Sequence, residues 1–165
     1  MRASGLHVTA GESMLSKLDF QGARYTMNKE IPVATGNFHP TLSPMGTFNA
    51  KDGLVNIAAN TDRMFTMLCE KLGCPSVAAD ERFTSPEKRK ANREDLNAII
   101  ETYTQNFAGQ TLIEMLNAEG IPCGPIYNIG EAFEDPQVRH LKMVSQANHP
   151  VLGSIGLVRS PINLS

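Results

Sequence analysis

The chain has 165 residues, of which 41% are hydrophobic and 19% are charged. This length and composition suit one globular domain, or one domain plus an arm, with a core that needs neither disulfides nor metal. The net charge of -2 offers no basic field for DNA, RNA or an anionic membrane surface, so none of these is an expected partner.

The three cysteines are an odd number, which argues against a disulfide framework. The N-terminal residues contain no apolar run long enough for a signal peptide, and no stretch of the sequence approaches a membrane span. We therefore expect a cytoplasmic protein.

Residues 1–35 differ in pattern from the rest of the chain. Met14, Leu15 and Leu18 give a short helical stripe, whereas Gly22–Gly36 shows no periodicity. This pattern predicts a short helix followed by an extended arm. Such an arm rarely folds alone, so we expect it to pack on a partner surface.

A β-hairpin is predicted next, from the extended candidates Gly46–Ala50 and Leu54–Ala59. Asp52–Gly53 lies between them and favours a tight primed turn, with a positive φ at Gly53. A β-branched residue at position 53 would then destabilise the domain. Because Leu54–Ala59 is almost entirely apolar, we expect an inner strand that is covered on both faces.

Two helices follow the hairpin. The first is capped by Asn60 or Thr61 and ends at Gly73, with an apolar face of Met64, Phe65, Met67, Leu68 and Leu72. The polar stretch Val77–Thr84 is expected to be irregular and to lie on the surface. Ser85 caps the second helix, whose Lys88–Arg93 end is predicted to be solvated charge and whose apolar stripe is Leu96, Ile99, Ile100 and Tyr103.

The remaining elements complete an α+β pattern. A third helix is predicted over Thr111–Glu119, and a fourth over Ile129–His140 with an interruption near Asp135–Pro136. Strands at Met143–Ala147 and Ile155–Arg159 flank the turn-rich segment between them. The order strand, strand, helices, strand, strand predicts an α+β fold with a small antiparallel sheet and about four helices.

Metal binding and nucleophilic catalysis find little support in the sequence. Cys69 and Cys74 are five residues apart, and the four histidines (His7, His39, His140 and His149) are scattered, so no pair has finger-like spacing. Cys69 falls on the apolar face of its helix, which favours core packing. Cys123 lies in the rigid segment Ile121–Pro125, which either presents its thiol outward or forms a structural turn. The turn is favoured, because no basic partner that would activate the thiol is assigned to it.

Residues Gly36, Asn37, Phe38, His39 and Pro40 form the most unusual local segment. They place an amide, an aromatic ring and an imidazole within three residues, between the arm and the hairpin. A single glycine that opens no helix is not a nucleotide-binding fingerprint. The segment is therefore either a loop that lies over a ligand or a turn that links two domains, and the residues alone favour the second reading.

Four segments taken together carry a family resemblance. They are Gly36–Pro40 followed by Ser43–Phe48; Lys51–Ala59; Gly120–Pro125; and Asp135–Gln137 with His149–Gly153 downstream. In this order and spacing they closely resemble the small domain of family III CoA-transferases of the CaiB–BaiF type, a group that includes formyl-CoA transferase and α-methylacyl-CoA racemase. The similarity covers about residues 36–165, and residues 1–35 resemble more loosely the helix and linker between the two domains of that family.

The resemblance implies a function and a substrate class. Members of the family move CoA between carboxylic acids or racemise an acyl-CoA, and in the transferases an aspartate of the large domain forms the covalent intermediates. The small domain supplies a loop over the acyl end, which here aligns with Gly36, Asn37, Phe38, His39 and Pro40 as substrate-binding residues. Coenzyme A or an acyl-CoA is then a substrate, and no covalently bound cofactor is implied.

One departure from the family limits what the resemblance implies. A complete member is about twice as long or more, and no segment here resembles its aspartate-bearing domain, so no catalytic residue is assigned. We expect a lid domain that is inactive by itself and has a large-domain CoA-transferase as a possible partner. The alternative is a stand-alone module that binds CoA, an acyl-CoA or a protein. Self-association through residues 1–35 is also expected, because their apolar side chains need a cover.

Overall fold

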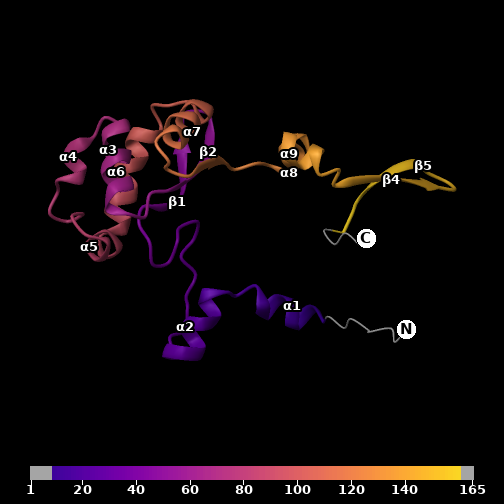
Figure 1. The fold of residues 1–165 in the computed structure, drawn as a ribbon, viewed down its shortest axis with the longest axis horizontal. Helices are drawn as coiled ribbons and strands as arrows, with labels where there is room; N and C mark the ends of the chain where they lie inside the picture. Colours follow the sequence, from indigo (N-terminus) through magenta and orange to yellow (C-terminus); the bar gives the residue numbers. More distant parts are fainter. Residues whose placement is uncertain (1–8, 161–165) are drawn as a thin grey trace. The chain divides into compact units, whose positions relative to one another are not determined.

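The structure is a computed structural model that describes residues 9–160 (Figure 1). The chain divides into two compact units, one ending at Pro40 and the other beginning at Thr41. Candidate residues Gly36–Pro40 thus close the first unit. Within the described residues, no helix is both long enough and apolar enough to cross a membrane.

The first unit contains two helices, α1 (Ala10–Ser16) and α2 (Phe20–Asn28). Thr9 and Glu12 form a capping box at the start of α1, which satisfies two backbone amides of the first turn. The prediction of an extended arm from Gly22 is wrong as far as Asn28, because this stretch forms most of α2. Neither helix contains a buried residue.

The second unit is built around a three-stranded antiparallel sheet in the order β1–β2–β3. Its strands are β1 (Met45–Ala50), β2 (Gly53–Ala58) and β3 (Cys123–Pro125). The predicted hairpin is confirmed, whereas the turn predicted around Cys123 is wrong, since this residue pairs with Ile57 of β2. A three-residue strand that follows one proline and ends on another carries too little periodicity to be identified from the sequence.

The hairpin turn differs from its prediction. Ala50 pairs with Gly53, so the two connecting residues are Lys51 and Asp52. None of Lys51, Asp52 and Gly53 has a positive φ, and the predicted primed turn is therefore wrong. The Asp52 carboxylate instead accepts a 2.7 Å hydrogen bond from the amide of Gly109. Gly109 is the first residue of helix α7 (Gly109–Ala118).

The central strand β2 is covered on one face only. Val55 and Ile57 are fully buried, whereas Leu54 is 43% exposed and Asn56 lies in solvent. This is the alternation expected for an antiparallel sheet with one solvated face. The prediction of a strand covered on both faces is consequently wrong.

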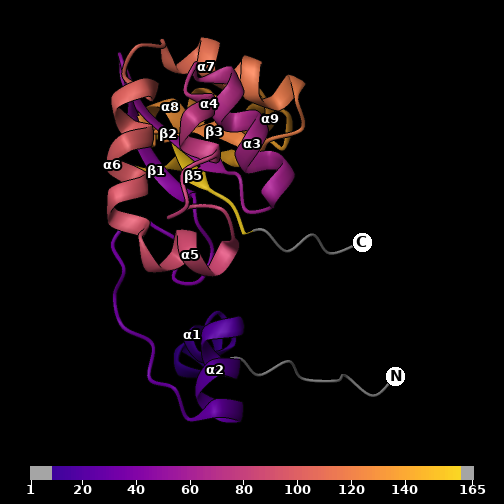
Figure 2. The ribbon, with the colours of Figure 1, turned by 90° about the vertical axis from the view of Figure 1, so that its left-hand side faces the viewer.

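Five helices lie between β2 and β3 in the chain, and the last two of them make most of the helix contacts with the sheet (Figure 2). They are α3 (Asp62–Lys71), α4 (Pro75–Ala78), α5 (Pro86–Ala91), α6 (Arg93–Thr104) and α7 (Gly109–Ala118). Thr61 and Ser85 accept backbone hydrogen bonds at the starts of α3 and α5, as predicted. The predicted second helix is divided at Asn92, whose φ of -107° and ψ of 30° interrupt the helical backbone.

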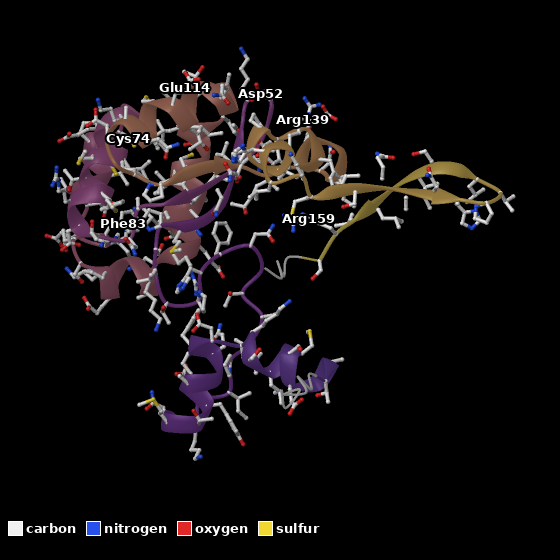
Figure 3. The ribbon with its side chains drawn as sticks, turned by 45° about the vertical axis from the view of Figure 1, so that its right-hand side comes forward. Asp52, Cys74, Phe83, Glu114, Arg139 and Arg159 are labelled. Carbon is white, nitrogen blue, oxygen red and sulfur yellow. The ribbon has the colours of Figure 1, made fainter. Side chains whose placement is uncertain are left out.

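Large apolar side chains from these elements and from two connecting segments form the core. It contains Phe48, Val55, Ile57, Phe65, Leu68, Phe83, Leu96, Ile100, Leu112, Leu116 and Ile121, each at most 2% exposed. Burial of each such side chain is worth roughly 1.5–3 kcal/mol. Phe83 lies in the stretch that was predicted to be a surface turn, and its complete burial corrects that prediction (Figure 3).

Both edges of the three-stranded sheet are closed by helix side chains. At the β1 edge, the Asn49 amide donates to Glu101 (3.0 Å), and Thr104 donates its hydroxyl proton to the Asn49 carbonyl (2.7 Å). At the β3 edge, Asn117 bonds both the amide and the carbonyl of Cys123, at 3.0 and 2.9 Å. Neither edge therefore offers these backbone groups to another strand.

The C-terminal part contains α8 (Ile129–Glu134), α9 (Pro136–His140) and a separate hairpin of β4 (Val144–His149) and β5 (Gly153–Val158). The predicted helix break is confirmed, with Asp135 capping α9. Arg159 donates to the carbonyls of Leu141 and Lys142 at the open end of the hairpin. The α+β class is confirmed, although the strands form two small sheets instead of one.

Candidate functional site

The candidate loop Gly36–Pro40 is a tight turn with its own internal contacts. Gly36 has a φ of +65°, a left-handed conformation that glycine adopts without strain. The Thr35 hydroxyl donates to the Phe38 carbonyl at 2.9 Å and closes the turn. Gly36 and Asn37 are exposed at its tip, whereas Phe38, His39 and Pro40 are half-buried.

The imidazole of His39 is held by an aromatic neighbour within the same unit. It stacks on the ring of Phe20, at the start of α2, with ring centroids 5.1 Å apart and planes inclined by 18°. This contact ties the end of the loop to the first unit. The turn thus presents its amide and backbone at the tip, while both aromatic groups are partly withdrawn from solvent.

The chain that follows the loop is anchored by Arg89. This residue is only 1% exposed, and its Nε donates to the Ser43 carbonyl at 3.0 Å. One Nη donates to the Phe83 carbonyl at 3.2 Å, and the other donates to Asp62 at 2.7 Å. The guanidinium also lies over the Phe65 ring, 4.8 Å from its centroid.

The position of Arg89 contradicts the prediction that Lys88–Arg93 is wholly solvated charge. Its neighbours Lys88 and Lys90 are exposed, so a single member of the basic run turns inward. The basic run carries no signal for this choice, because the two carbonyls that accept from Arg89 lie outside the run, at Phe83 and at the distant Ser43. Pairing and hydrogen bonding are what make a buried guanidinium tolerable.

A cavity of about 290 Å³ lies between the hairpin turn, the start of α7 and the segment before α8. Its lining combines apolar residues such as Leu54 and Ile113 with polar side chains at the rim. Those polar groups already bond within the protein: Asp52 to Gly109, Gln110 to Glu114, Tyr127 to Asp135, and Glu131 to Asn128. The polar side chains around this cavity are therefore already engaged in hydrogen bonds within the protein. Figure 3 shows Asp52 and Glu114 at this end of the unit.

Cys123 lines a second cavity of about 290 Å³, together with Asn56 and Asn117. Burial raises the pKa of its thiol to about 11. A thiol with such a pKa is largely protonated near neutral pH and is a poor nucleophile. Within residues 9–160, no group of three or more His, Cys, Asp and Glu side chains lies together as a metal site.

Comparison with known proteins identifies the family. The family model described as CoA-transferase family III matches residues 3–165. The chain belongs to this family. A crystal structure of a CaiB/BaiF family protein from Brucella suis superposes with a TM-score of 0.76 at 32% sequence identity, covering 91% of this chain and 38% of that one.

The names of similar CoA-transferases describe reactions on CoA thioesters of dicarboxylic acids. A succinyl-CoA:mesaconate CoA-transferase from Haloarcula hispanica is 34% identical over 155 residues, which are 93% of this chain and 38% of the relative. A succinate–glutarate CoA-transferase from Agrobacterium fabrum is 33% identical over 147 residues, which are 88% of this chain and 36% of the relative. The chain thus spans little more than a third of the length of these relatives.

Proposed function

We propose that residues 36–165 serve as the small, lid-type domain of a CoA-transferase, and that Gly36–Pro40 covers the acyl end of a CoA thioester. Membership of CoA-transferase family III over residues 3–165 is the observation that carries this proposal. The exposed tip of the loop, Gly36 and Asn37, supports it.

The chemistry of the loop suits the acyl end of the substrate better than its phosphates. Residues 36–40 contain no lysine or arginine, so they bring no cation to pair with a phosphate. The Asn37 side chain supplies amide N–H donors and a carbonyl acceptor, which fit the oxygens of a thioester or a carboxylate. The stacking of Phe20 on His39 would keep the turn in one conformation as the substrate enters.

We propose succinyl-CoA or a related dicarboxylic thioester as the substrate. This follows from the names of the relatives, among which succinyl-CoA recurs with mesaconate, citramalate and glutarate as partners. Residues 1–165 alone are not expected to transfer CoA, because they correspond to about 38% of such a relative. The covalent step is assigned to residues of the family fold outside this segment.

Isothermal titration of the 165-residue chain with CoA, acetyl-CoA and succinyl-CoA tests the proposal. We expect weak binding that favours the thioesters and is reduced severalfold by Asn37→Ala. Asn148→Ala, at another exposed asparagine, is the matched control and should bind as the unchanged chain does. Absence of binding by a chain shown to be folded would favour a protein-interaction module instead.

A CoA-transfer assay with succinyl-CoA and glutarate supplies the second test. The 165-residue chain should give no succinate above background. Transfer that a single substitution within the chain abolishes would contradict the assignment of the covalent step to other residues.

A further inference from the structure

The C-terminus of α3 ends in a Schellman motif. Gly73 has a φ of +79° and follows the last helical residues. Its amide donates to the Glu70 carbonyl at 3.1 Å, and the next amide, of Cys74, donates to the Cys69 carbonyl at 2.8 Å. These two bonds are the defining pair of the motif, with a left-handed glycine at the position where it is favoured.

This motif brings the side chains of Cys69 and Cys74 together. The residues that flank a Schellman turn in these two positions usually make an apolar contact. Here both are cysteines, and they are 0% and 2% exposed. A hydrogen bond between the two side chains raises the pKa of Cys69, which keeps its proton, and lowers the pKa of Cys74.

We propose that Cys69 and Cys74 form a redox-active dithiol, which closes to an intramolecular disulfide by exchange with a low-molecular-weight disulfide such as oxidised glutathione. The pairing rests on the fixed backbone of the motif, which holds positions 69 and 74 adjacent. It is independent of the proposed acyl-CoA function.

The exchange proceeds in two balanced steps. The Cys74 thiolate attacks one sulfur of the small disulfide, so its S–S bond breaks and one small thiolate leaves. The Cys69 sulfur then gives up its proton and attacks the Cys74 sulfur of the mixed disulfide, which releases the second small thiolate. Two protein thiols are oxidised, the small disulfide is reduced, and the two protons end on the two small thiols.

Access to the buried thiols requires opening of a short segment only. Gly73 and the neighbouring Glu70, Lys71 and Ser76 are exposed, so the motif lies at the protein surface. The following helix α4 has four residues, of which only Val77 is buried. Local opening of such a segment costs less than global unfolding, and it brings both sulfurs within reach of a small oxidant.

Equilibration of the full chain with mixtures of oxidised and reduced glutathione tests the proposal, followed by acid quenching and peptide mass spectrometry. In native buffer we expect a Cys69–Cys74 peptide that has lost two hydrogens. Its equilibrium constant against glutathione should be at least about tenfold larger than in concentrated urea, because the folded motif holds the sulfurs together. No substitution is needed for this measurement.

Cysteine variants provide the matched controls. Cys123→Ala removes a half-buried cysteine of another element and should leave the equilibrium unchanged. Cys74→Ala should abolish the two-hydrogen loss. The proposal is overturned if the native and urea constants are equal, if the native constant is the smaller, or if Cys123 supplies one sulfur of the bond.

Discussion

Arg89 is a cation that the fold has placed in its core. Its side chain joins segments around positions 43, 62 and 83, which are far apart in sequence. The Asp62 side chain is 69% exposed, so solvent screens its charge. The ion pair by itself therefore contributes little to the stability of the fold. The stabilisation comes mainly from the two buried carbonyls, of Ser43 and Phe83, that the guanidinium satisfies.

Substitution Arg89→Met should therefore destabilise the chain strongly. Methionine keeps much of the apolar volume but leaves both carbonyls without this donor, at a cost of about 2–5 kcal/mol in the free energy of unfolding. Urea unfolding followed by circular dichroism measures the loss. Arg89→Lys keeps the charge but lacks the planar fork of donors, so its free energy of unfolding should lie between those of the unchanged chain and Arg89→Met.

The neighbouring exposed residue gives the control for this prediction. Lys90→Met changes a solvated member of the same basic run and should alter stability by less than about 0.5 kcal/mol. Equal losses for the Arg89 and Lys90 variants would show that the buried contacts do not carry the stability.

At the scale of elements, the β1–β2 hairpin and helix α7 stabilise each other. Asp52 accepts from the Gly109 amide, and the Lys51 amide donates to the Phe107 carbonyl at 2.9 Å. The turn thus acts as an N-terminal cap for a helix whose own cap residue, Ala108, has no side-chain acceptor. The carboxylate also lies at the positive end of the helix dipole.

We expect Asp52→Ala to lower the free energy of unfolding by about 0.5–2 kcal/mol, as for loss of a helix cap. Asp52→Asn retains a carbonyl acceptor and should lose less. Thermal or urea unfolding of the three proteins provides the measurement.

Gly53→Ala tests the same turn from the other side. Gly53 lacks a left-handed φ, and a Cβ at this position would meet no atom within 4 Å. The substitution should therefore change stability by less than about 0.5 kcal/mol. A large loss would restore the primed turn that the Asp-Gly pair had predicted.

At the scale of the whole molecule, buried residues are confined to the middle of the chain. Among the described residues, positions 9–42 and 122–160 contain none. Both flanks nevertheless carry exposed apolar side chains, including Leu15 at 69% and Ile129 at 80%. Such flanks gain little from their own packing and need another surface to bury these side chains.

Self-association of the 165-residue chain through residues 1–35 is the corresponding prediction. Light scattering should give a dimer for the chain and a monomer for a version that begins at Val33. Leu15→Gln, on the exposed surface of α1, should weaken the dimer without deletion of any residue. A chain that stays monomeric at high micromolar concentration, or a shortened version that remains dimeric, would exclude the N-terminal interface.

Local sequence determined the features that depend on neighbouring residues. Thr61, one of the two predicted candidates, and Ser85 cap helices as predicted, because a cap is formed by side chains and amides two or three residues apart. The family was also identifiable from the order of four short segments. Placement of Gly36–Pro40 at the substrate remains a prediction that rests on that resemblance.

Tertiary structure decided the features that depend on distant partners. Arg89 is buried because the Ser43 carbonyl, which is distant in sequence, and the nearer Phe83 carbonyl both accept from its guanidinium. The basic run itself has no pattern that distinguishes Arg89 from its exposed neighbours. Asp52 adopts its turn because Gly109 offers an amide, and Cys123 becomes a strand because β2 and Asn117 bond its backbone. Hydrogen-bond partners that arrive only when the chain folds override local preference, and for these residues they determined the outcome.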